Sequence, residues 1–378
     1  MYNSYLEVDL AAIKNNINIT REKIGPKLDI IAVLKGNAYG LGLTQIGKFL
    51  ADNCDIRTFG CASVYEAVSL RETGVNKNIL VLGGVPYHNI KPVVEYDFHT
   101  PAFEAEYLRL LEAEAKKAAK TVYVHIKIET GLNRIGVCPG SDLDELCEYI
   151  KTLEHVKVRG VFTHFIESGK PDKKRTHEQM DKFKEGLAQV RSHGFTPDFV
   201  HVSNTAASTW LSDDEITHIR PGGLLYGFDD NFDEKMYSVN LFALKEAASW
   251  RTFITNVKTV PVGETVGYDG VFKVTKPTKV ATVGMGYGDG YTRTLGISGK
   301  AWMLVNGKKA PVIAICMDQL FLDVSGIDDV SINDRVTVLG RDGDECISIF
   351  DFARVMNQTH LALMSLISQR VGRTYINS

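Results

Sequence analysis

The alternation of short apolar runs with amphipathic stretches between about residues 28 and 225 constrains the fold more than any other sequence feature. Several runs are apolar at consecutive positions, which is typical of parallel strands covered by helices. About eight such strand–helix repeats predict an α/β fold, a (β/α)8 TIM-like barrel, with a doubly wound open sheet as the alternative. The predicted strands are Asp29–Lys35, Thr58–Ala62, Ile79–Gly83, Tyr96–Thr100, Val122–Ile128, Val158–His164, Asp198–Ser203 and Ile216–Arg220.

The sequence changes character after about residue 235, where strand-like runs follow one another without intervening helices. Glycine, asparagine and aspartate turns separate these runs, and helical patterns return only at Phe350–Met356 and Ala362–Leu366. We therefore predict a barrel domain over residues 1–235 and a mostly β C-terminal domain over residues 236–378. The runs are Ser249–Val260, Val280–Met285, Trp302–Val305, Ala310–Cys316 and Arg335–Leu339.

Composition argues against several classes of function. The 378 residues include 43 Lys and Arg against 46 Asp and Glu, a net charge of -3, so no basic field is available for nucleic acid. No apolar run reaches the roughly 18 residues of a membrane helix, and no secretion leader is recognisable, so we expect a cytoplasmic protein. The six cysteines form no CxxC pair, which favours buried reduced thiols and no metal site.

Polar and cationic residues follow the predicted barrel strands. In a barrel of this type, reactive side chains gather at the C-terminal ends of the strands. We therefore expect one face to collect the residues at these ends. They are Lys35, Arg134, His164, Asn204, Thr205, Arg220, Gly222 and Gly223.

Lys35 ends an apolar strand, Ile30–Leu34. Burial there would lower the pKa of its amine and make it available for a Schiff base. The alternative is a lysine whose stem is buried and whose amine simply reaches solvent. The polar and cationic residues predicted at the same strand ends argue against this alternative. The loops at residues 203–205 and 222–223 offer backbone N–H groups and hydroxyls that suit a phosphate, although each is also typical of an ordinary turn.

These residues belong to motifs that resemble the alanine racemases, fold-type III pyridoxal 5'-phosphate (PLP) enzymes. Val33–Gly40 resembles the PLP-lysine motif and Glu129–Gly136 the arginine loop of that family. The resemblance extends over nearly the whole chain, and eight motifs in family order make it specific. The other six are Thr163–Phe165, His201–Ala207, Arg220–Gly222, Val266–Tyr268, Gly286–Tyr291 and Cys316–Gln319.

The resemblance implies a PLP-dependent racemase that interconverts L- and D-alanine and supplies D-alanine for peptidoglycan. Lys35 would bind PLP and act as the base on one face of the substrate, with Tyr268 as the base on the opposite face. Two bases are needed because a single base tends to return the proton to the face it left. His164 and Arg220 would support Tyr268, and Arg220 would also face the ring nitrogen of the cofactor.

The resemblance further implies binding residues and a partner. Members of the family are homodimers in which the β domain completes the partner's site, so Tyr268, Tyr287 and Met317 would serve the other subunit's Lys35. Lys127 stands where some members carry a carbamylated lysine. The implied cofactor-binding residues are Lys35, Tyr39, Arg134, Asn204, Thr205, Arg220, Gly222 and Gly223. The implied substrate-binding residues are Arg134, Tyr287, Met317 and Gln369.

Departures from the family pattern leave the substrate open. Gln369 stands where a tyrosine is usual, and its smaller amide side chain could admit a hydroxymethyl group. Asn133 replaces the usual glycine of the arginine loop. A serine or broader-specificity racemase is therefore an alternative. Two alternatives lie outside racemisation. A PLP decarboxylase of this architecture would carry a substrate-binding Cys and Asp pair, which Cys316–Asp318 resembles only in part. A non-catalytic PLP-binding protein is the other alternative, and that class typically lacks the β domain.

Overall fold

The computed structural model describes residues 2–233 and 238–377, which form two compact units. The barrel unit consists of Ala12–Ala38 and the described residues of Leu43–Glu246. The β unit consists of the described residues of Met1–Ala11, Tyr39–Gly42 and Ala247–Ser378. The predicted fold class, an α/β barrel with a β-rich C-terminal domain, is confirmed. The domain boundary predicted between residues 235 and 236 lies outside the described residues.

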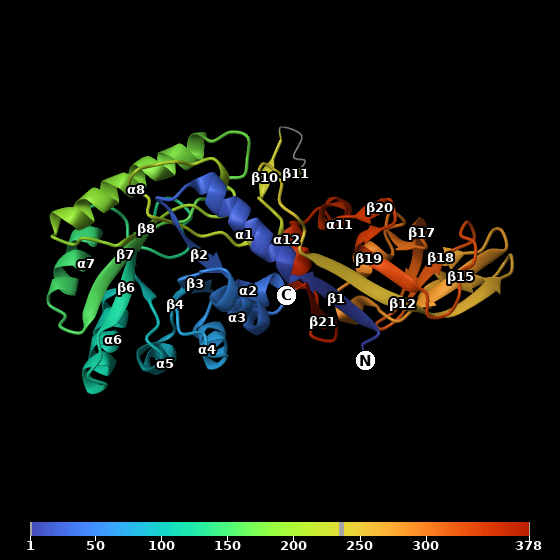
Figure 1. Ribbon diagram of the computed structural model, residues 1–378, viewed down its shortest axis with the longest axis horizontal. Coiled ribbons are helices and arrows are strands. Elements are labelled where there is room, and N and C mark those ends of the chain that lie inside the picture. The colour runs from blue at the N-terminus through green and yellow to red at the C-terminus, as the bar shows by residue number, and fades with distance from the viewer. Residues whose placement is uncertain (1, 234–237, 378) are drawn as a thin grey trace. The chain divides into compact units, whose positions relative to one another are not determined.

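The barrel unit contains parallel strands in two four-stranded sheets, ordered β4-β3-β2-β9 and β5-β6-β7-β8 (Figure 1). A parallel bridge between Leu80 and His99 joins the sheets at one seam. At the other seam, the Thr217 N–H donates to the Val200 carbonyl at 2.9 Å. The strands are β2 (Asp29–Val33), β3 (Thr58–Cys61), β4 (Asn78–Val81), β5 (Thr100–Ala102), β6 (Val122–Lys127), β7 (Val156–Phe162), β8 (Phe199–His201) and β9 (His218–Ile219).

One predicted strand, Tyr96–Thr100, was placed too early. Tyr96 instead ends a helix, where its N–H donates to the Pro92 carbonyl at 3.0 Å, and β5 begins only at Thr100. The helices as far as residue 246 are α1 (Leu10–Ile24), α2 (Lys35–Tyr39), α3 (Leu43–Asn53), α4 (Val64–Glu72), α5 (Ile90–Glu95), α6 (Ala105–Lys117), α7 (Ser141–Lys151), α8 (Lys174–Ser192) and α9 (Gly223–Tyr226). Single 3-10 turns occur at Tyr87–Asn89 and Ala207–Thr209.

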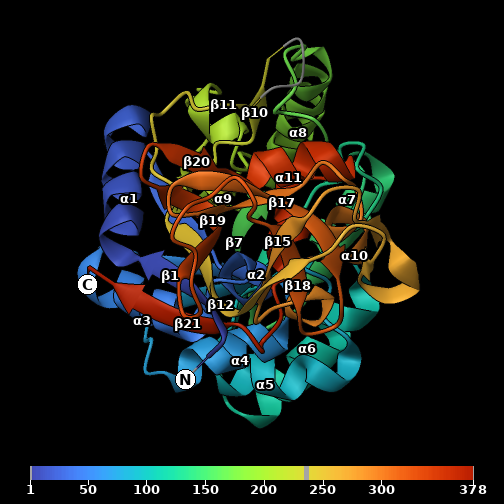
Figure 2. The same cartoon turned by 90° about the vertical axis from the view of Figure 1, so that its right-hand side faces the viewer.

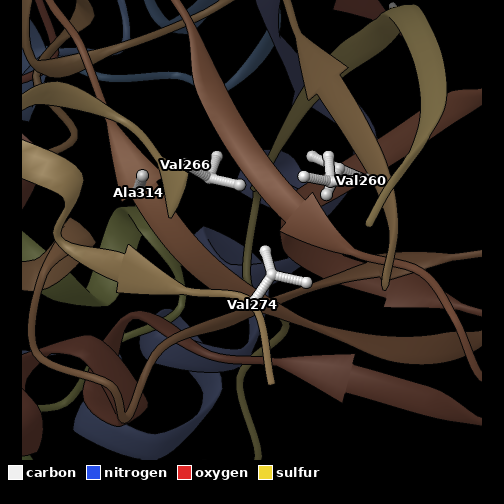
Figure 3. Close-up of a cluster of buried hydrophobic side chains, with 5 residues drawn as sticks. Val260, Val266, Val274 and Ala314 are labelled. Atoms are coloured by element: carbon white, nitrogen blue, oxygen red, sulfur yellow. The ribbon is translucent and has the colours of Figure 1, made fainter. Parts of the chain in front are cut away.

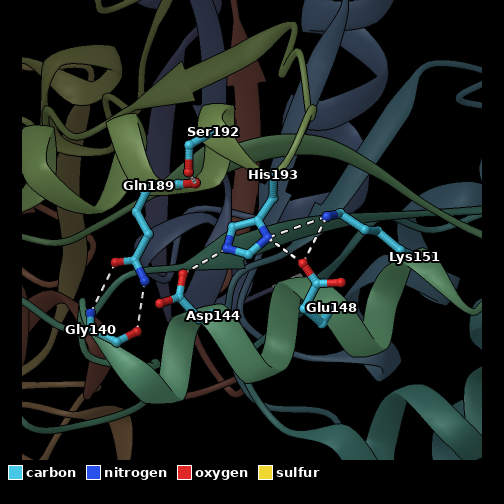
Figure 4. A network of polar contacts seen from close by, with 7 residues as sticks. All are labelled: Gly140, Asp144, Glu148, Lys151, Gln189, Ser192 and His193. Carbon is cyan, nitrogen blue, oxygen red and sulfur yellow. Dashed lines mark hydrogen bonds and ion pairs between the residues drawn. The ribbon is translucent and has the colours of Figure 1, made fainter.

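A polar network joins the neighbouring outer helices α7 and α8 (Figure 4). His193, at the end of α8, contacts Asp144 through Nε2 at 2.6 Å and Glu148 through Nδ1 at 2.8 Å. The Gln189 amide exchanges two hydrogen bonds with the backbone of Gly140, at 2.9 and 2.6 Å. The contact with His193 is the main reason that the pKa of the Asp144 carboxyl is lowered. These contacts fix the packing of two helices whose apolar faces cover the sheet.

The β unit is built on a nine-stranded sheet in the order β20-β19-β16-β17-β18-β15-β12-β1-β21 (Figure 2). The N-terminal strand β1 belongs to this sheet, antiparallel to β12 and parallel to β21. These strands are β1 (Ser4–Asp9), β12 (Ala248–Val260), β15 (Thr278–Val283), β16 (Trp302–Val305), β17 (Lys308–Ile315), β18 (Leu320–Asp323), β19 (Arg335–Asp342), β20 (Glu345–Ile347) and β21 (Gly372–Ile376).

Short elements complete the chain. The remaining helices are α10 (Arg293–Gly296), α11 (Ile349–Met356) and α12 (His360–Ser365), with 3-10 turns at Tyr268–Gly270 and Tyr287–Asp289. The remaining strand pairs are β10 (Asn231–Phe232) with β11 (Ser238–Val239), and β13 (Thr265–Val266) with β14 (Phe272–Lys273). Within the described part of the chain, no helix has the length and apolar character needed to cross a membrane.

An apolar cluster supports the hairpin that precedes and follows Tyr268 (Figure 3). Its buried members are Val260, Val266, Val274, Val280 and Ala314. Burying a valine side chain contributes about 1.5–3 kcal/mol, so the four valines of the cluster anchor β13 and β14 to the larger sheet.

Candidate active site

The carboxyl ends of the parallel barrel strands bring the predicted cationic residues together. Lys35 follows β2, Arg134 lies in the loop after β6, His164 follows β7 and Arg220 follows β9. The charges of Arg134 and Arg220 act on both the Lys35 amine and the His164 ring. The expected gathering of these side chains at one end of the barrel is therefore present in the structure.

The Lys35 amine has a lowered pKa although its side chain keeps solvent-exposed surface. Protein atoms around the amine remove part of its water, and this desolvation is the largest cause of the shift. Repulsion from Arg134 and Arg220 lowers the pKa further. A larger fraction of the amine is consequently neutral and nucleophilic near neutral pH.

Arg220 is the buried centre of the site, with only 4% of its surface exposed. Its guanidinium donates to the carbonyls of His201 at 2.6 Å, Thr163 at 2.7 Å and Val202 at 3.1 Å. It also lies 3.4 Å from Nδ1 of His164. Burial and the nearby Arg134 lower the pKa of Arg220 to about 9. The Arg220 hydrogen bonds therefore join the ends of β7, β8 and β9 and fix the positions of these strand ends relative to one another.

Three buried histidines continue from Arg220 through the barrel. Arg220 Nη1 lies 3.0 Å from His201 Nδ1, His201 Nε2 lies 2.9 Å from His125 Nδ1, and His125 Nε2 lies 3.1 Å from His99 Nδ1. Since an arginine only donates, His201 must accept through Nδ1. For neutral rings, each Nε2–H then donates to the next ring. Sequence reasoning missed this chain, because His99, His125 and His201 come from three different strands or strand ends.

Replacing His99 with glutamine is expected to reduce the pH dependence of stability below pH 6.5. Burial, then Arg159 and Arg71, lowers the His99 pKa from 6.5 to about 4. Because the unfolded chain binds the proton first, the free energy of unfolding falls as the pH drops from 6.5 to about 4. His99 alone accounts for about 3 kcal/mol of this fall. Denaturant unfolding at half-unit pH steps measures the slope.

The control for this experiment is His88→Gln, since His88 is exposed and lies outside the histidine chain. This variant is expected to keep the wild-type slope of unfolding free energy against pH. A wild-type slope in His99→Gln as well would contradict the assignment of the acid sensitivity to the buried ring.

Backbone donors and hydroxyls gather after β8 and β9. The N–H groups of Gly222 and Gly223 both donate to Thr205 Oγ1 at 3.0 Å. A Cβ on Gly223 would lie 2.7 Å from the Phe228 carbonyl oxygen, so only glycine fits there. The Ser203 hydroxyl is buried and has no hydrogen-bond partner among the described residues. The two glycine N–H groups hold the Thr205 oxygen in place, and the hydroxyls of Ser203 and Thr205 each have a proton to donate in a hydrogen bond to an anion.

The Asn204 side chain forms hydrogen bonds within the protein that support the loop after β8. Its Oδ1 accepts from the Ser168 hydroxyl at 2.7 Å and from the Ala207 N–H at 3.1 Å. The Ser168 carbonyl in turn accepts from Lys173 at 2.7 Å and from the Trp210 indole at 3.0 Å. Asn204 therefore ties the loop after β8 to the loop after β7.

Lys127 lies at the end of β6 with 2% of its surface exposed. Its amine donates to the Ile128 carbonyl at 2.8 Å and lies 5.6 Å from the centre of the Phe162 ring. Desolvation lowers its pKa to about 8, against the opposing attraction of Glu129. Glu129 accepts from the Gly131 N–H, which shapes the loop that carries Arg134.

Five of the predicted site residues belong to the β unit. Tyr268 is 72% exposed, Met317 55% and Tyr287 39%, and Gln369 is also exposed. Tyr39, the last residue of α2, has a positive φ of 56°. Tyr268, Met317 and Tyr287 therefore present large apolar surfaces to solvent within this unit instead of packing a core.

Tyr268 stands on a sharply turned backbone. It is preceded by Gly267 with φ 81° and followed by Asp269 with φ 58°. A Cβ on Gly267 would lie 2.6 Å from the Ala314 Cβ, so the close approach requires glycine. Val266, two residues before Tyr268, belongs to the apolar cluster of Figure 3, whereas Tyr268 itself is exposed to solvent.

Glu66 was not predicted from the sequence. It accepts hydrogen bonds from the backbone that directly follows Lys35. A signal was available, because Ser63-x-x-Glu66 has the spacing of a capping box at the start of a helix. That signal indicates a helix start but not a link to the neighbouring strand end.

The chain is similar to known proteins over its full length. The family model for the alanine racemase N-terminal domain matches residues 8–230, and that for the C-terminal domain matches residues 247–375. An alanine racemase of Methanococcus maripaludis is 34% identical, covering 99% of this chain and 98% of the relative. One from Clostridium perfringens is 35% identical, covering 98% and 95%. The crystal structure of Bacillus anthracis alanine racemase with bound L-Ala-P has TM-score 0.93, 29% identity and coverage of 100% and 96%.

Proposed function

The chain belongs to the alanine racemase family, and we propose that it is a PLP-dependent isomerase that interconverts L- and D-alanine. The proposal is supported above all by the family match, which spans both units. In addition, Lys35, Arg220 and a set of groups suited to an anion lie at the ends of the barrel strands. The supply of D-alanine for peptidoglycan follows from that activity.

The residues present at the rim fit PLP by their chemistry. The partly desolvated Lys35 amine suits the aldehyde. The buried Ser203 hydroxyl, which has no hydrogen-bond partner among the described residues, suits the phosphate together with Thr205, Gly222 and Gly223. Arg220 would face the pyridine nitrogen and leave it unprotonated, since a guanidinium donates and does not accept. Tyr39, Arg134 and Asn204 complete the proposed cofactor-binding residues.

When bound, PLP supplies the electron-withdrawing group that acidifies the Cα–H bond of an amino acid. The chain's own residues must then move the proton. The Lys35 amine would remove or return it on one face, and Tyr268 would do so on the other. His164 and Arg220 would stabilise the tyrosine in its deprotonated form, because positive charge favours phenolate. Arg134 would hold the substrate carboxylate.

We propose a homodimer in which the β unit completes the partner's site. The exposure of Tyr268, Tyr287 and Met317 supports this, because large apolar surfaces that stay exposed in one chain often mark an interface. Tyr268 would then act opposite the partner's Lys35, and Tyr287, Met317 and Gln369 would line the substrate site. The polar, exposed Gln369 favours one second candidate, a serine or broader-specificity racemase.

Incubation of the PLP-loaded protein with L-alanine and, separately, L-serine tests the function. Chiral chromatography is expected to detect D-alanine forming faster than D-serine. D-serine in excess would support the second candidate and point to Gln369. Release of carbon dioxide would indicate a decarboxylase, whereas bound PLP with no change in either amino acid would contradict the proposed reaction.

A further inference from the structure

The backbone that directly follows Lys35 is left-handed over four consecutive residues. Gly36, Asn37, Ala38 and Tyr39 have φ values of 64°, 56°, 53° and 56°. Such a conformation is sterically unfavourable for each residue other than glycine, so it persists only where its surroundings hold it. The turn therefore needs an anchor.

The Glu66 carboxylate is that anchor. Its Oε1 accepts from the N–H of Gly36 at 2.7 Å and from that of Asn37 at 3.3 Å. Its Oε2 accepts from the Ala62 N–H at 2.8 Å. Successive N–H groups of a turned backbone form a concave anion site, and bonds to a charged acceptor are about twice as strong as neutral ones.

Glu66 reaches the turn because β2 and β3 are neighbours. Val33 pairs with Gly60, and the Leu34 N–H donates to the Gly60 carbonyl at 2.8 Å. Glu66 occupies the third position of α4 and would ordinarily bond to the N–H of its own helix cap, Ser63. It bonds instead to the ends of both strands. One carboxylate thus joins the backbone after Lys35 to the start of α4.

Two further bonds complete the turn. The Asn37 side-chain oxygen accepts from the Leu43 N–H at 2.9 Å, and the Ala38 N–H donates to the Leu34 carbonyl at 2.8 Å. The first bond ties the turn to the start of α3, and the second ties it back to the end of β2. Within the described contacts of the turn, Glu66 is the charged group that bonds to the N–H of the residue next to Lys35.

We propose that Glu66 is the positioning residue of Lys35: its carboxylate holds the left-handed turn and so fixes the direction in which the amine enters the site. This inference rests on the proposed function for the identity of PLP as the group that the amine takes. Glu66 also has an electrostatic effect, because its charge raises the pKa of Lys35 while burial, Arg134 and Arg220 lower it.

The test uses Glu66→Ala in the full chain freed of cofactor. The Lys35 amine condenses with the PLP aldehyde and releases water, and the rise in visible absorbance gives the rate of capture. We expect capture to slow by about 10- to 100-fold, because the variant loses the charge-assisted hydrogen bonds that hold the turn. The racemisation kcat is expected to fall by a similar factor with little change in KM. Thermal unfolding reports whether the variant is folded.

Two more variants separate positioning from folding. In Glu66→Gln the amide accepts on one side only, so we expect a smaller loss of rate. Its capture is also expected to extend to lower pH, because the charge that supported the protonated amine is gone while Arg134, Arg220 and Asp230 remain. In Glu66→Ala, adding Ala38→Gly removes the steric penalty of a left-handed alanine and is expected to restore part of the rate.

Glu72→Gln is the matched control, since Glu72 is exposed at the end of the same helix. It is expected to capture PLP at the wild-type rate. Wild-type capture rate and pH profile in both Glu66 variants, or a fall in Tm alone, would overturn the inference. Capture does not require racemisation, so a wild-type protein that captures PLP but racemises nothing would refute the proposed function and leave this test valid.

Discussion

Replacing Lys35 with alanine is expected to lower the rate of alanine racemisation by about 10³-fold or more, since a positioned base alone contributes about 10²–10⁴. The variant loses both the nucleophile for PLP and the base on one face of the substrate. Burial and the charges of Arg134 and Arg220 lower the pKa of this amine and so favour its neutral form. An alanine side chain has no amine that could take over either role. Chiral chromatography measures the rate, and absorbance measures covalent PLP.

Lys91→Ala is the control, because Lys91 is an exposed lysine on α5 whose ion pair with Glu95 lies at the surface. It should retain wild-type turnover. Lys35→Ala is expected to stay folded, because its side chain is exposed at the rim and not packed in the core. Undiminished racemisation by Lys35→Ala would refute the role of Lys35 as the catalytic lysine.

Replacing Tyr268 with phenylalanine is expected to lower racemisation by about 10²–10⁴-fold while sparing exchange on one face. With Lys35 as the remaining base, a proton removed from one enantiomer returns to the face that it left. In D₂O, one enantiomer of alanine should therefore incorporate deuterium at Cα without inversion. Mass spectrometry after chiral separation measures both quantities. The loss of one exposed hydroxyl leaves folding unchanged, since Tyr268 is 72% exposed.

Tyr65→Phe removes a hydroxyl from a tyrosine that is 80% exposed on α4, and it should behave as wild type. Equal loss of exchange and racemisation in Tyr268→Phe would argue against a two-base mechanism. Mixed dimers test the proposed shared site, because a heterodimer of Lys35→Ala and Tyr268→Phe subunits would contain one intact site if each site takes residues from both chains. Random reassociation should recover about a quarter of the wild-type activity, whereas sites confined to one chain would recover none.

Local patterns in the sequence predicted much of the barrel. The strand before Lys35 was recognisable because consecutive apolar residues identify a strand covered on both faces, and its end identifies the rim. Lys35, His164 and Arg220 could therefore be identified from the sequence alone. For Tyr268 the residues alone indicated only a core tyrosine, and its assignment as a base came from the family resemblance.

Contacts between residues distant in sequence were decided by the tertiary structure. β1 belongs to the β unit because it pairs with β12 and β21. Both partners are more than two hundred residues away in the sequence, so no local pattern could predict this pairing. The His99–His125–His201 chain depends on side chains beside β5, on β6 and on β8 meeting inside the barrel, although β7 separates β6 from β8 in the sheet. Sequence by itself determined the periodicity, the strand ends and the chemistry available there. Only the closed barrel decided which of those groups touch, because parallel pairing brings distant strand ends together and lets Glu66 hold the turn at Lys35.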